Sequence, residues 1–204
     1  MKTILCYGDS NTFGFNTIDG SRFDRNMRWT SLLQKKLNNE YKVINEGMCD
    51  RTGFVINPKG VLFSAPTHFP KLISKFDNID ILILWIGTND LQFPYDITIE
   101  EIKTRLKELI SLSKEKTNNI IIIPPVKLDN RVLNGYFNIL FNKTSITKSQ
   151  DLNAIYEEIA YENNCLYFDV NIITTPCDID GLHYDANSHK IIADSLYKFI
   201  KENF

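Results

Sequence analysis

Residues 79–90 read IDILILWIGTND, and this stretch is the strongest indication of fold class in the chain. Its first eight residues form a short apolar run that is interrupted only by Asp80, which is typical of a strand buried on both faces of a parallel sheet. A turn rich in polar side chains follows at once. Two further runs have the same character, Thr3–Tyr7 and Ile120–Ile123. The pattern therefore predicts at least three buried parallel strands.

Helical segments alternate with these strands along the chain. The spacing predicts a helix from Thr98, where Thr98 and Glu101 form a capping box ahead of an apolar stripe. Further helices are expected at Trp29–Leu37, Ser149–Glu162 and Asn187–Ile200, and weaker strands at Tyr41–Asn45 and Leu166–Val170. The predicted order is β-α-β-β-α-β-α-β-α, with the stretch after Gly47 left unassigned.

Strands that alternate with helices predict an α/β fold, a doubly wound parallel sheet covered by helices in three layers. Ligands bind such sheets beyond the carboxyl ends of the strands. No repeat, Gly/Ser linker or charge run divides the chain, so a single domain over residues 1–204 is expected. Two long connections, 49–70 and 124–148, contain several aromatic residues and are expected to form functional walls, lids or subunit contacts.

Composition and charge exclude several classes of function. Lys and Arg number 23 against 25 Asp and Glu, a net charge of -2, so no strong positive field is available for nucleic acid or an anionic membrane. The longest apolar run is far shorter than the roughly 18 to 20 residues of a membrane span, and no export signal is visible. Four cysteines without C-x-x-C spacing indicate free thiols rather than a zinc site or disulfides. These features predict a cytoplasmic protein without a nucleic-acid partner.

Polar side chains follow the predicted strands at one rim of the sheet. Ser10 comes after the first strand and Asn89 after the third, while Asp180 and His183 lie in the loop before the last helix. A serine hydroxyl becomes a useful nucleophile when an imidazole accepts its proton. The imidazole in turn needs an acceptor at its other nitrogen. We therefore interpret Ser10 as the candidate nucleophile, His183 as the base and Asp180 as the carboxylate that orients it.

The same rim offers hydrogen-bond donors for the negative charge of a tetrahedral intermediate. The candidates for this oxyanion hole are the backbone N–H groups of Ser10 and Gly47 and the side-chain amide of Asn89. Gly47 lacks the Cβ that would keep a substrate away from its backbone. Each residue also has a purely structural interpretation, as a helix cap or a turn residue. Their occurrence on one rim in a workable chemical order favours catalysis.

Two other histidines are alternative bases. Neither His68 nor His189 follows an Asp at three residues' spacing in a loop, and His189 is expected on the exposed first turn of the last helix. Both are therefore interpreted as structural or solvated residues.

Four sequence blocks together resemble those of the SGNH hydrolases, also called the GDSL esterase/lipase superfamily. They span almost the whole chain and read Gly8-Asp9-Ser10, Gly47, Gly87-Thr88-Asn89-Asp90 and Asp180-Gly181-Leu182-His183. The resemblance implies a flavodoxin-like sheet with strand order 2-1-3-4-5 and neither a metal nor an organic cofactor. It also implies site roles, with a triad of Ser10, His183 and Asp180 and an oxyanion hole of Ser10, Gly47 and Asn89.

Two shorter blocks are similar to the arylesterase and acyltransferase subgroup, which handles short acyl esters. They are Arg28-Trp29-Thr30 and Glu46-Gly47 followed by Arg51-Thr52. The similarity implies a short acyl group and is compatible with a homo-oligomer. Phe13 stands where acyltransferase-like members carry Trp, which argues against efficient transfer to alcohols.

The leading hypothesis is a serine esterase that hydrolyses short-chain, in particular acetyl, esters of alcohols, phenols or sugars through an acyl-enzyme on Ser10. Its partner would be a small-molecule ester. One alternative is a thioesterase or lysophospholipase of the same superfamily. The other is a non-catalytic nucleotide- or phosphate-binding domain, because residues 8–12 open a helix after a strand. Against this alternative, the sequence contains neither of the phosphate-binding motifs G-x-G-x-x-G and G-x-x-x-x-G-K-[ST], and the carboxylate of Asp9 would repel phosphate.

Overall fold

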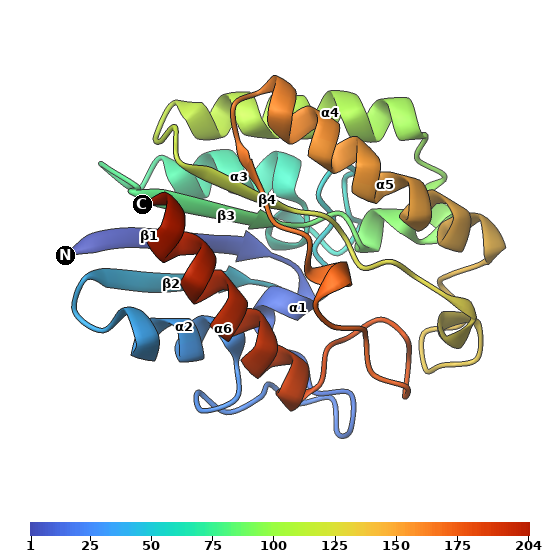
Figure 1. The fold of residues 1–204 in the computed structure, drawn as a ribbon. Helices are drawn as coiled ribbons and strands as arrows, with labels where there is room; N and C mark the ends of the chain where they lie inside the picture. Colours follow the sequence, from blue (N-terminus) through green and yellow to red (C-terminus); the bar gives the residue numbers. More distant parts are fainter.

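A computed structural model describes residues 1–204 and contains a five-stranded parallel sheet between two layers of helices (Figure 1). The strands are β1 (Lys2–Gly8), β2 (Tyr41–Gly47), β3 (Ile81–Trp85), β4 (Ile120–Ile123) and β5 (Leu166–Tyr167). Their order in the sheet is β2-β1-β3-β4-β5 and every pairing is parallel. The predicted doubly wound fold and its strand order are confirmed.

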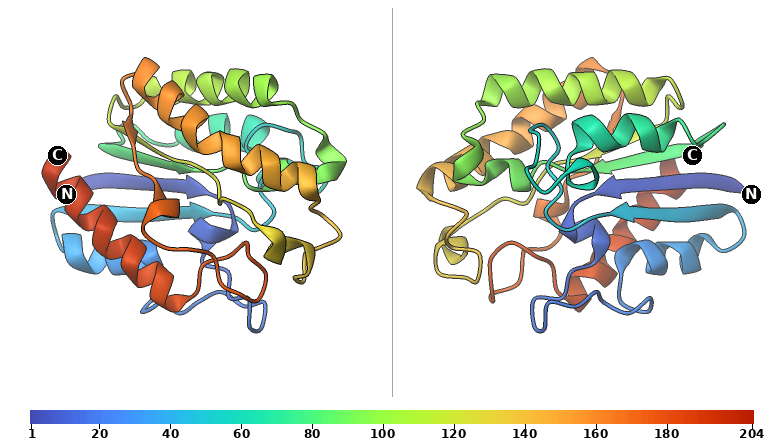
Figure 2. Two further views of the ribbon diagram at one scale, coloured as in Figure 1. Left: turned by 45° about the vertical axis from the view of Figure 1, so that its right-hand side comes forward. Right: turned by 180° about the vertical axis from the view of Figure 1, so that it is seen from behind.

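The chain contains six helices, and all of them except the first, which is a single turn, cover the two faces of this sheet. They are α1 (Ser10–Phe13), α2 (Trp29–Leu37), α3 (Ala65–Ile73), α4 (Ile99–Lys114), α5 (Lys143–Glu162) and α6 (Ala186–Asn203). Helices α2 and α6 lie on one face, and α3, α4 and α5 lie on the other (Figures 1 and 2). This division follows from right-handed crossovers, because the chain moves outward from β1 to β2 and then in the opposite direction from β2 to β3, β4 and β5.

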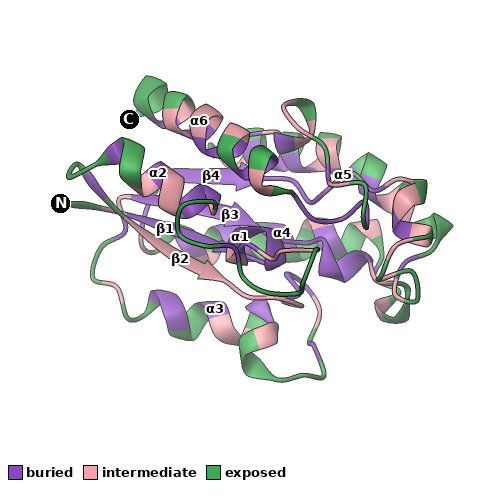
Figure 3. Cartoon of the chain, turned by 90° about the horizontal axis from the view of Figure 1, so that it is seen from below, coloured by how far each residue is buried: buried purple, intermediate pink, exposed green.

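The central strands are buried on both faces, whereas the edge strand β2 is half-buried (Figure 3). β3 and β4 consist of apolar residues throughout, mostly isoleucine and leucine, and every one of them is buried. Apolar side chains can fill both faces here because helices cover both faces. The continuous apolar runs that predicted these strands therefore reflect their two-sided burial.

Helix α3 corrects the predicted element order, which has no helix between β2 and β3. A parallel connection needs a crossover of a dozen or more residues, and that crossover is usually a helix. Pro66 in the first turn of α3 and Pro70 inside it obscure the helical pattern in the sequence. The long connection predicted at 49–70 therefore ends at Ser64, because α3 begins at the next residue.

Helix α5 begins at Lys143, earlier than the predicted Ser149. Asn142 caps it, and Asn142 and Ser145 form a reciprocal capping box. The second long connection therefore ends at Asn142. Strand β5 is also shorter than expected, because Asp169 caps a short 3-10 helix at Val170–Ile172.

The carboxyl ends of the strands meet at one rim of the sheet. Gly8 at the end of β1 pairs with Gly47 on one side and Trp85 on the other, and Trp85 pairs with Ile123. Both chain termini lie at the opposite end of the sheet (Figure 2). None of the helices combines the length and apolar character that crossing a membrane requires.

Candidate active site

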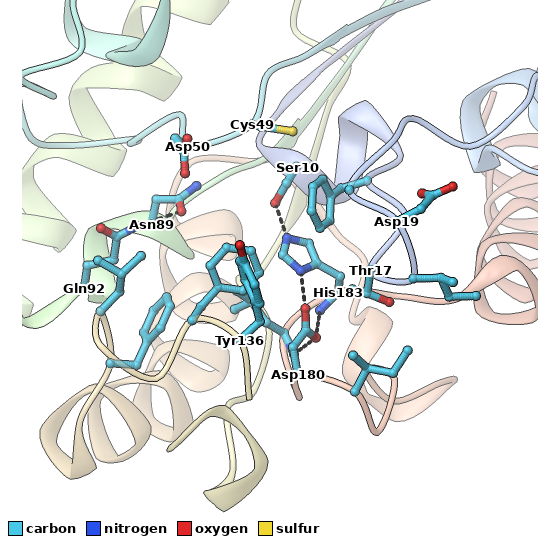
Figure 4. Close-up of a pocket in the computed structure, with 18 residues that line it drawn as sticks. Ser10, Thr17, Asp19, Cys49, Asp50, Asn89, Gln92, Tyr136, Asp180 and His183 are labelled. Carbon is cyan, nitrogen blue, oxygen red and sulfur yellow. Dashed lines mark hydrogen bonds and ion pairs between the residues drawn. The ribbon is translucent and has the colours of Figure 1, made fainter. Parts of the chain in front are cut away.

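Three predicted site residues from distant parts of the chain form a hydrogen-bonded row at this rim (Figure 4). His183 Nε2 lies 2.8 Å from Ser10 Oγ, and His183 Nδ1 lies 2.7 Å from Asp180 Oδ2. All three residues are buried. The row has the order carboxylate, imidazole, hydroxyl, in which the imidazole can accept the hydroxyl proton while the carboxylate holds the opposite nitrogen.

The hydroxyl of Ser10 can face His183 because it is not used to cap helix α1. Asp9, rather than Ser10, is the N-cap of α1, and its carboxylate accepts the N–H of Asn11 at 3.0 Å. Burial raises the pKa of Asp9 to about 6, although the N–H of Asn11 opposes the shift. This carboxylate also occupies the helix end that the phosphate-binding alternative would need, so the geometry favours a nucleophile over an anion site.

Asp180 is held by the turn that leads to His183. Its Oδ1 accepts the N–H groups of Leu182 at 2.9 Å and His183 at 3.0 Å, and the Cys177 thiol also donates to it. Burial raises the pKa of Asp180, but the hydrogen bonds and the charge of His183 outweigh it, so the pKa lies below its ordinary value. An ionised Asp180 accepts a hydrogen bond from the Nδ1–H group of His183, which leaves Nε2 to face Ser10.

Asn89 reaches the same cavity from the short 3-10 helix Asn89–Leu91, which follows β3. Its Nδ2 donates to the carbonyl of Arg51 at 3.0 Å, and its Oδ1 accepts from Gln92 Nε2 at 3.0 Å. These two bonds fix which way the amide faces. The second N–H of Nδ2 has no acceptor in the protein and is available to a ligand.

Gly47 is the one predicted site residue that the structure does not bring to the cavity. Its N–H donates to Asn45 Oδ1 at 3.0 Å, and it is not among the residues that line the cavity. A Cβ at this position would collide with the backbone of Thr12 and Phe13. The glycine is therefore needed so that the end of β2 can pack against α1, and not for the approach of a substrate.

Asp50 lies at the cavity although it is not among the site residues predicted from the sequence. It lines the cavity together with Ser10 and Asn89, and its N–H makes no hydrogen bond within the protein. Its φ of 61° lies in the left-handed region, which Asp tolerates better than most residues but which is still uncommon. The only feature of the sequence that indicates a place for Asp50 near the site is its position shortly after Gly47, in the loop that follows β2.

The buried side chain of Arg51 holds the loop that carries Asp50. Its exposed fraction is 1%, and its guanidinium carbon lies 4.4 Å from the centre of the Tyr7 ring. The guanidinium donates to three backbone carbonyls, those of Gly8, Glu46 and Leu62. Arg51 thus ties the ends of β1 and β2 to the loop, while its own carbonyl positions Asn89.

Asp90 holds the continuation of the same loop. Its buried carboxylate accepts the three consecutive N–H groups of residues 53–55 at distances between 2.6 and 3.0 Å. Burial raises the pKa of Asp90 to about 7, although these three hydrogen bonds favour the ionised form. The residue next to Asn89 therefore anchors the loop that presents Asp50.

A cavity of about 550 Å³ opens at Ser10 and His183. The rings of Phe15 and Phe137 lie with their centres 4.6 and 5.4 Å from that of His183. Phe141 and Tyr136 add further aromatic wall, so the connection after β4 does line the site as expected. Phe54, from the other long connection, packs instead into the hydrophobic core.

The other two histidines lie outside this cavity. His68 is half-buried with its Nδ1 3.3 Å from the Tyr7 hydroxyl, and burial lowers its pKa to about 4. His189 is fully buried and accepts the N–H of Trp29 at Nδ1, at 3.3 Å. The expectation that His189 is exposed was wrong, because the first turn of α6 packs against the start of α2.

The cysteines are all free thiols. Cys49 lines the cavity, and burial raises the pKa of its thiol to about 12. Nowhere in the chain do three or more His, Cys, Asp or Glu side chains gather in a way that could hold a metal ion.

Residues 6–191 match the GDSL-like Lipase/Acylhydrolase family. The chain belongs to this family. As a GDSL acylhydrolase it is a carboxylic ester hydrolase, and its substrates are small-molecule esters. The chain has no match among curated proteins.

Solved structures share the fold of this GDSL hydrolase over its full length. A carbohydrate acetylesterase family member from Sinorhizobium meliloti is 26% identical, with a TM-score of 0.90 and coverage of 99% of this chain and 98% of that one. The aryl esterase of M. smegmatis is 22% identical, with a TM-score of 0.90 and full coverage of both chains. The lipase/acylhydrolase from Enterococcus faecalis is 21% identical, with a TM-score of 0.70 and coverage of 99% and 96%.

Proposed function

We propose that this GDSL hydrolase cleaves short-chain carboxylic esters, in particular acetyl esters of alcohols, phenols or sugars, through an acyl-enzyme on Ser10. The observation that carries the proposal is the unbroken row from Asp180 through His183 to Ser10, with contacts of 2.7 and 2.8 Å, at the base of a cavity. A hydroxyl, a base and a carboxylate in this order are what nucleophilic ester hydrolysis requires.

In the first step, His183 Nε2 takes the proton from Ser10 Oγ, and Oγ forms a bond to the ester carbonyl carbon. The carbonyl electron pair moves onto its oxygen, which becomes an oxyanion. The donors proposed for this charge are the N–H groups of Ser10 and Asp50 and the amide of Asn89. Asp180 stabilises the imidazolium that forms on His183.

In the second step, the bond to the alcohol oxygen breaks and His183 gives its proton to the departing alcohol, leaving the acyl group on Ser10. A water molecule then attacks the acyl-enzyme through the same steps. His183 accepts a proton from the water, the hydroxide oxygen bonds to the acyl carbon, and the acid leaves as Ser10 regains its proton. No oxidant, reductant or further co-reactant is needed.

The acyl length is proposed from relatives and from the cavity. Two structures of the same fold are named as a carbohydrate acetylesterase family member and an aryl esterase, which supports a short acyl group. The volume of about 550 Å³ and the side chains of Leu140 and Phe141 in its wall favour the alternative, a thioesterase or lysophospholipase that accepts longer chains.

A labelling experiment tests Ser10 as the nucleophile, and a series of esters tests the preference for a short acyl group. A fluorophosphonate should add once to the protein by intact-mass spectrometry, and the adduct should be lost in Ser10→Ala. Among p-nitrophenyl esters of increasing chain length, kcat/KM should be highest for acetate and fall with length. An adduct that persists in Ser10→Ala would refute the nucleophile, whereas a maximum at long chains would support the alternative.

A further inference from the structure

The charged side chains that line the cavity are all acidic. They are Asp19, Asp50 and Asp180, and no Lys or Arg lines the cavity. Asp180 is engaged with His183, and Asp50 forms an ion pair of 2.7 Å with Lys59. Asp19 has no cationic partner. Hydrogen bonds from Ser21 hold the pKa of Asp19 below its ordinary value, so its carboxylate is ionised at neutral pH.

Aromatic rings also flank His183 in this cavity. The rings of Phe15 and Phe137 contact each other edge to face with centres 6.1 Å apart, and Tyr136 packs against Phe137 at 5.1 Å. The faces of aromatic rings carry negative potential, which attracts cations and quaternary ammonium groups in particular. The cavity therefore combines an aromatic wall with an unpaired carboxylate.

The position of His183 decides which half of an ester meets this wall. Because His183 Nε2 must return a proton to the departing alcohol, the alcohol half lies against His183 and hence against Phe15 and Phe137. In Figure 4 Asp19 lies on the far side of Ser10 from Asn89. The carboxylate of Asp19 is thus on the side away from the proposed oxyanion donor of Asn89, where an alcohol half can extend.

The basic residue nearest to Asp19 in sequence does not compensate for this charge. Arg22 donates to the carbonyl of Phe13 and to Asn45 Oδ1, and its guanidinium stacks 4.3 Å from the centre of the Phe13 ring. It does not line the cavity. An alcohol or thiol half that carries phosphate would find no cationic side chain on the cavity wall.

We propose that this site selects esters whose alcohol half carries an ammonium group over neutral and anionic esters of the same shape. The selection is made by the Phe15 and Phe137 rings together with the carboxylate of Asp19. It rests on the proposed function, because the role of His183 assigns the alcohol to this wall. Esters of cationic amino alcohols are the substrate class that this wall fits.

Three acetyl esters of matched shape test the selection. Acetylcholine is cationic, 3,3-dimethylbutyl acetate is its neutral isostere, and 2-acetoxyethanesulfonate is anionic. We expect kcat/KM for acetylcholine to exceed that for the neutral ester by about fivefold or more, the range of one or two cation–π contacts. The anionic ester should be the poorest substrate. Because Asp19 is exposed, added salt should reduce the preference for the cation.

A pair of charge-matched variants locates the origin of the preference. Asp19→Asn removes the charge but keeps an acceptor for Ser21, and it should lower the ratio of cationic to neutral kcat/KM by about threefold. Asp24→Asn is the control, since it removes the same charge from the same loop at an exposed position outside the cavity. The control should leave the ratio unchanged.

The outcomes separate this proposal from the one on which it rests. Hydrolysis of the neutral ester and labelling of Ser10 without any preference for acetylcholine would overturn the cation selection alone. Equal effects of Asp19→Asn and Asp24→Asn would overturn the role of Asp19. Absence of both Ser10 labelling and hydrolysis of p-nitrophenyl acetate would overturn the esterase mechanism and the selection together.

Discussion

At the scale of single residues, the site depends on donors that other side chains hold in place. Asn89 is the clearest case, because its carbonyl oxygen and one of its N–H groups are already bound by Gln92 and Arg51. The remaining N–H cannot turn away without breaking both bonds. Preorganisation of this kind makes a donor effective against the charge that develops in a transition state.

We therefore expect Asn89→Ala to lower kcat by roughly 10² to 10³, the range observed when one oxyanion donor is deleted. KM should change little, because the hydrogen bond strengthens mainly as negative charge builds on the carbonyl oxygen. The measurement is kcat per active site, with sites titrated by fluorophosphonate. If Asn89 only shapes the turn, the titrated fraction and the melting temperature fall while kcat per site stays constant.

At the scale of elements, α6 supplies an acceptor that α2 lacks. The N-cap of α2, Arg28, makes no side-chain capping bond, so the N–H of Trp29 is one of the unsatisfied donors at a helix start. His189 on α6 accepts it at Nδ1. Burial lowers the pKa of His189 to about 4 from an ordinary 6.5, so the imidazole is neutral in the folded protein.

The contact between His189 and Trp29 predicts that the free energy of unfolding decreases at acid pH. A histidine whose pKa is lower in the folded state contributes stability that is fully present above pH 6.5 and is lost as the pH falls towards 4. Between pH 7 and pH 5 the loss from His189 amounts to about 2 kcal/mol. His189→Asn keeps an acceptor but cannot titrate, so its free energy of unfolding should fall less over that interval. Parallel curves for the two proteins would contradict the prediction.

At the scale of the whole molecule, the two ends of the chain depend on each other. Helix α2 from the first fifth of the chain packs against the C-terminal α6, with an ion pair of 2.6 Å between Lys36 and Asp194. Both helices cover the same face of the sheet (Figure 1). The N-terminal strands therefore have no complete cover until the last helix is in place.

We expect the chain to unfold as a single unit, as proposed from the sequence for residues 1–204. Trp29 and Trp85 are both fully buried and lie with ring centres 6.0 Å apart, so tryptophan fluorescence reports on the core between α2 and β3. In urea, this signal and far-ultraviolet circular dichroism should change with one common midpoint. Separate midpoints would indicate two independently folding parts.

Features that depend on local pattern could be read from the sequence. The buried strands were predictable because residues covered on both faces must be apolar along their whole length. The capping box at Thr98 and Glu101 was predictable because both partners lie within one turn. The strand-end positions of Ser10 and Asn89 followed from the same pattern, since parallel strands end at a common rim.

Features that depend on contacts between distant residues could be read only from the tertiary structure. Gly47 and Asp50 lie in the same short block, but only the packing of α1 against Gly47 and the free N–H of Asp50 distinguish a structural glycine from a candidate donor. The burial of His189 likewise depends on Trp29, far away in sequence. Sequence patterns record which residues are apolar or able to cap, whereas burial and unused hydrogen-bonding groups are properties of neighbours that only the folded chain brings together.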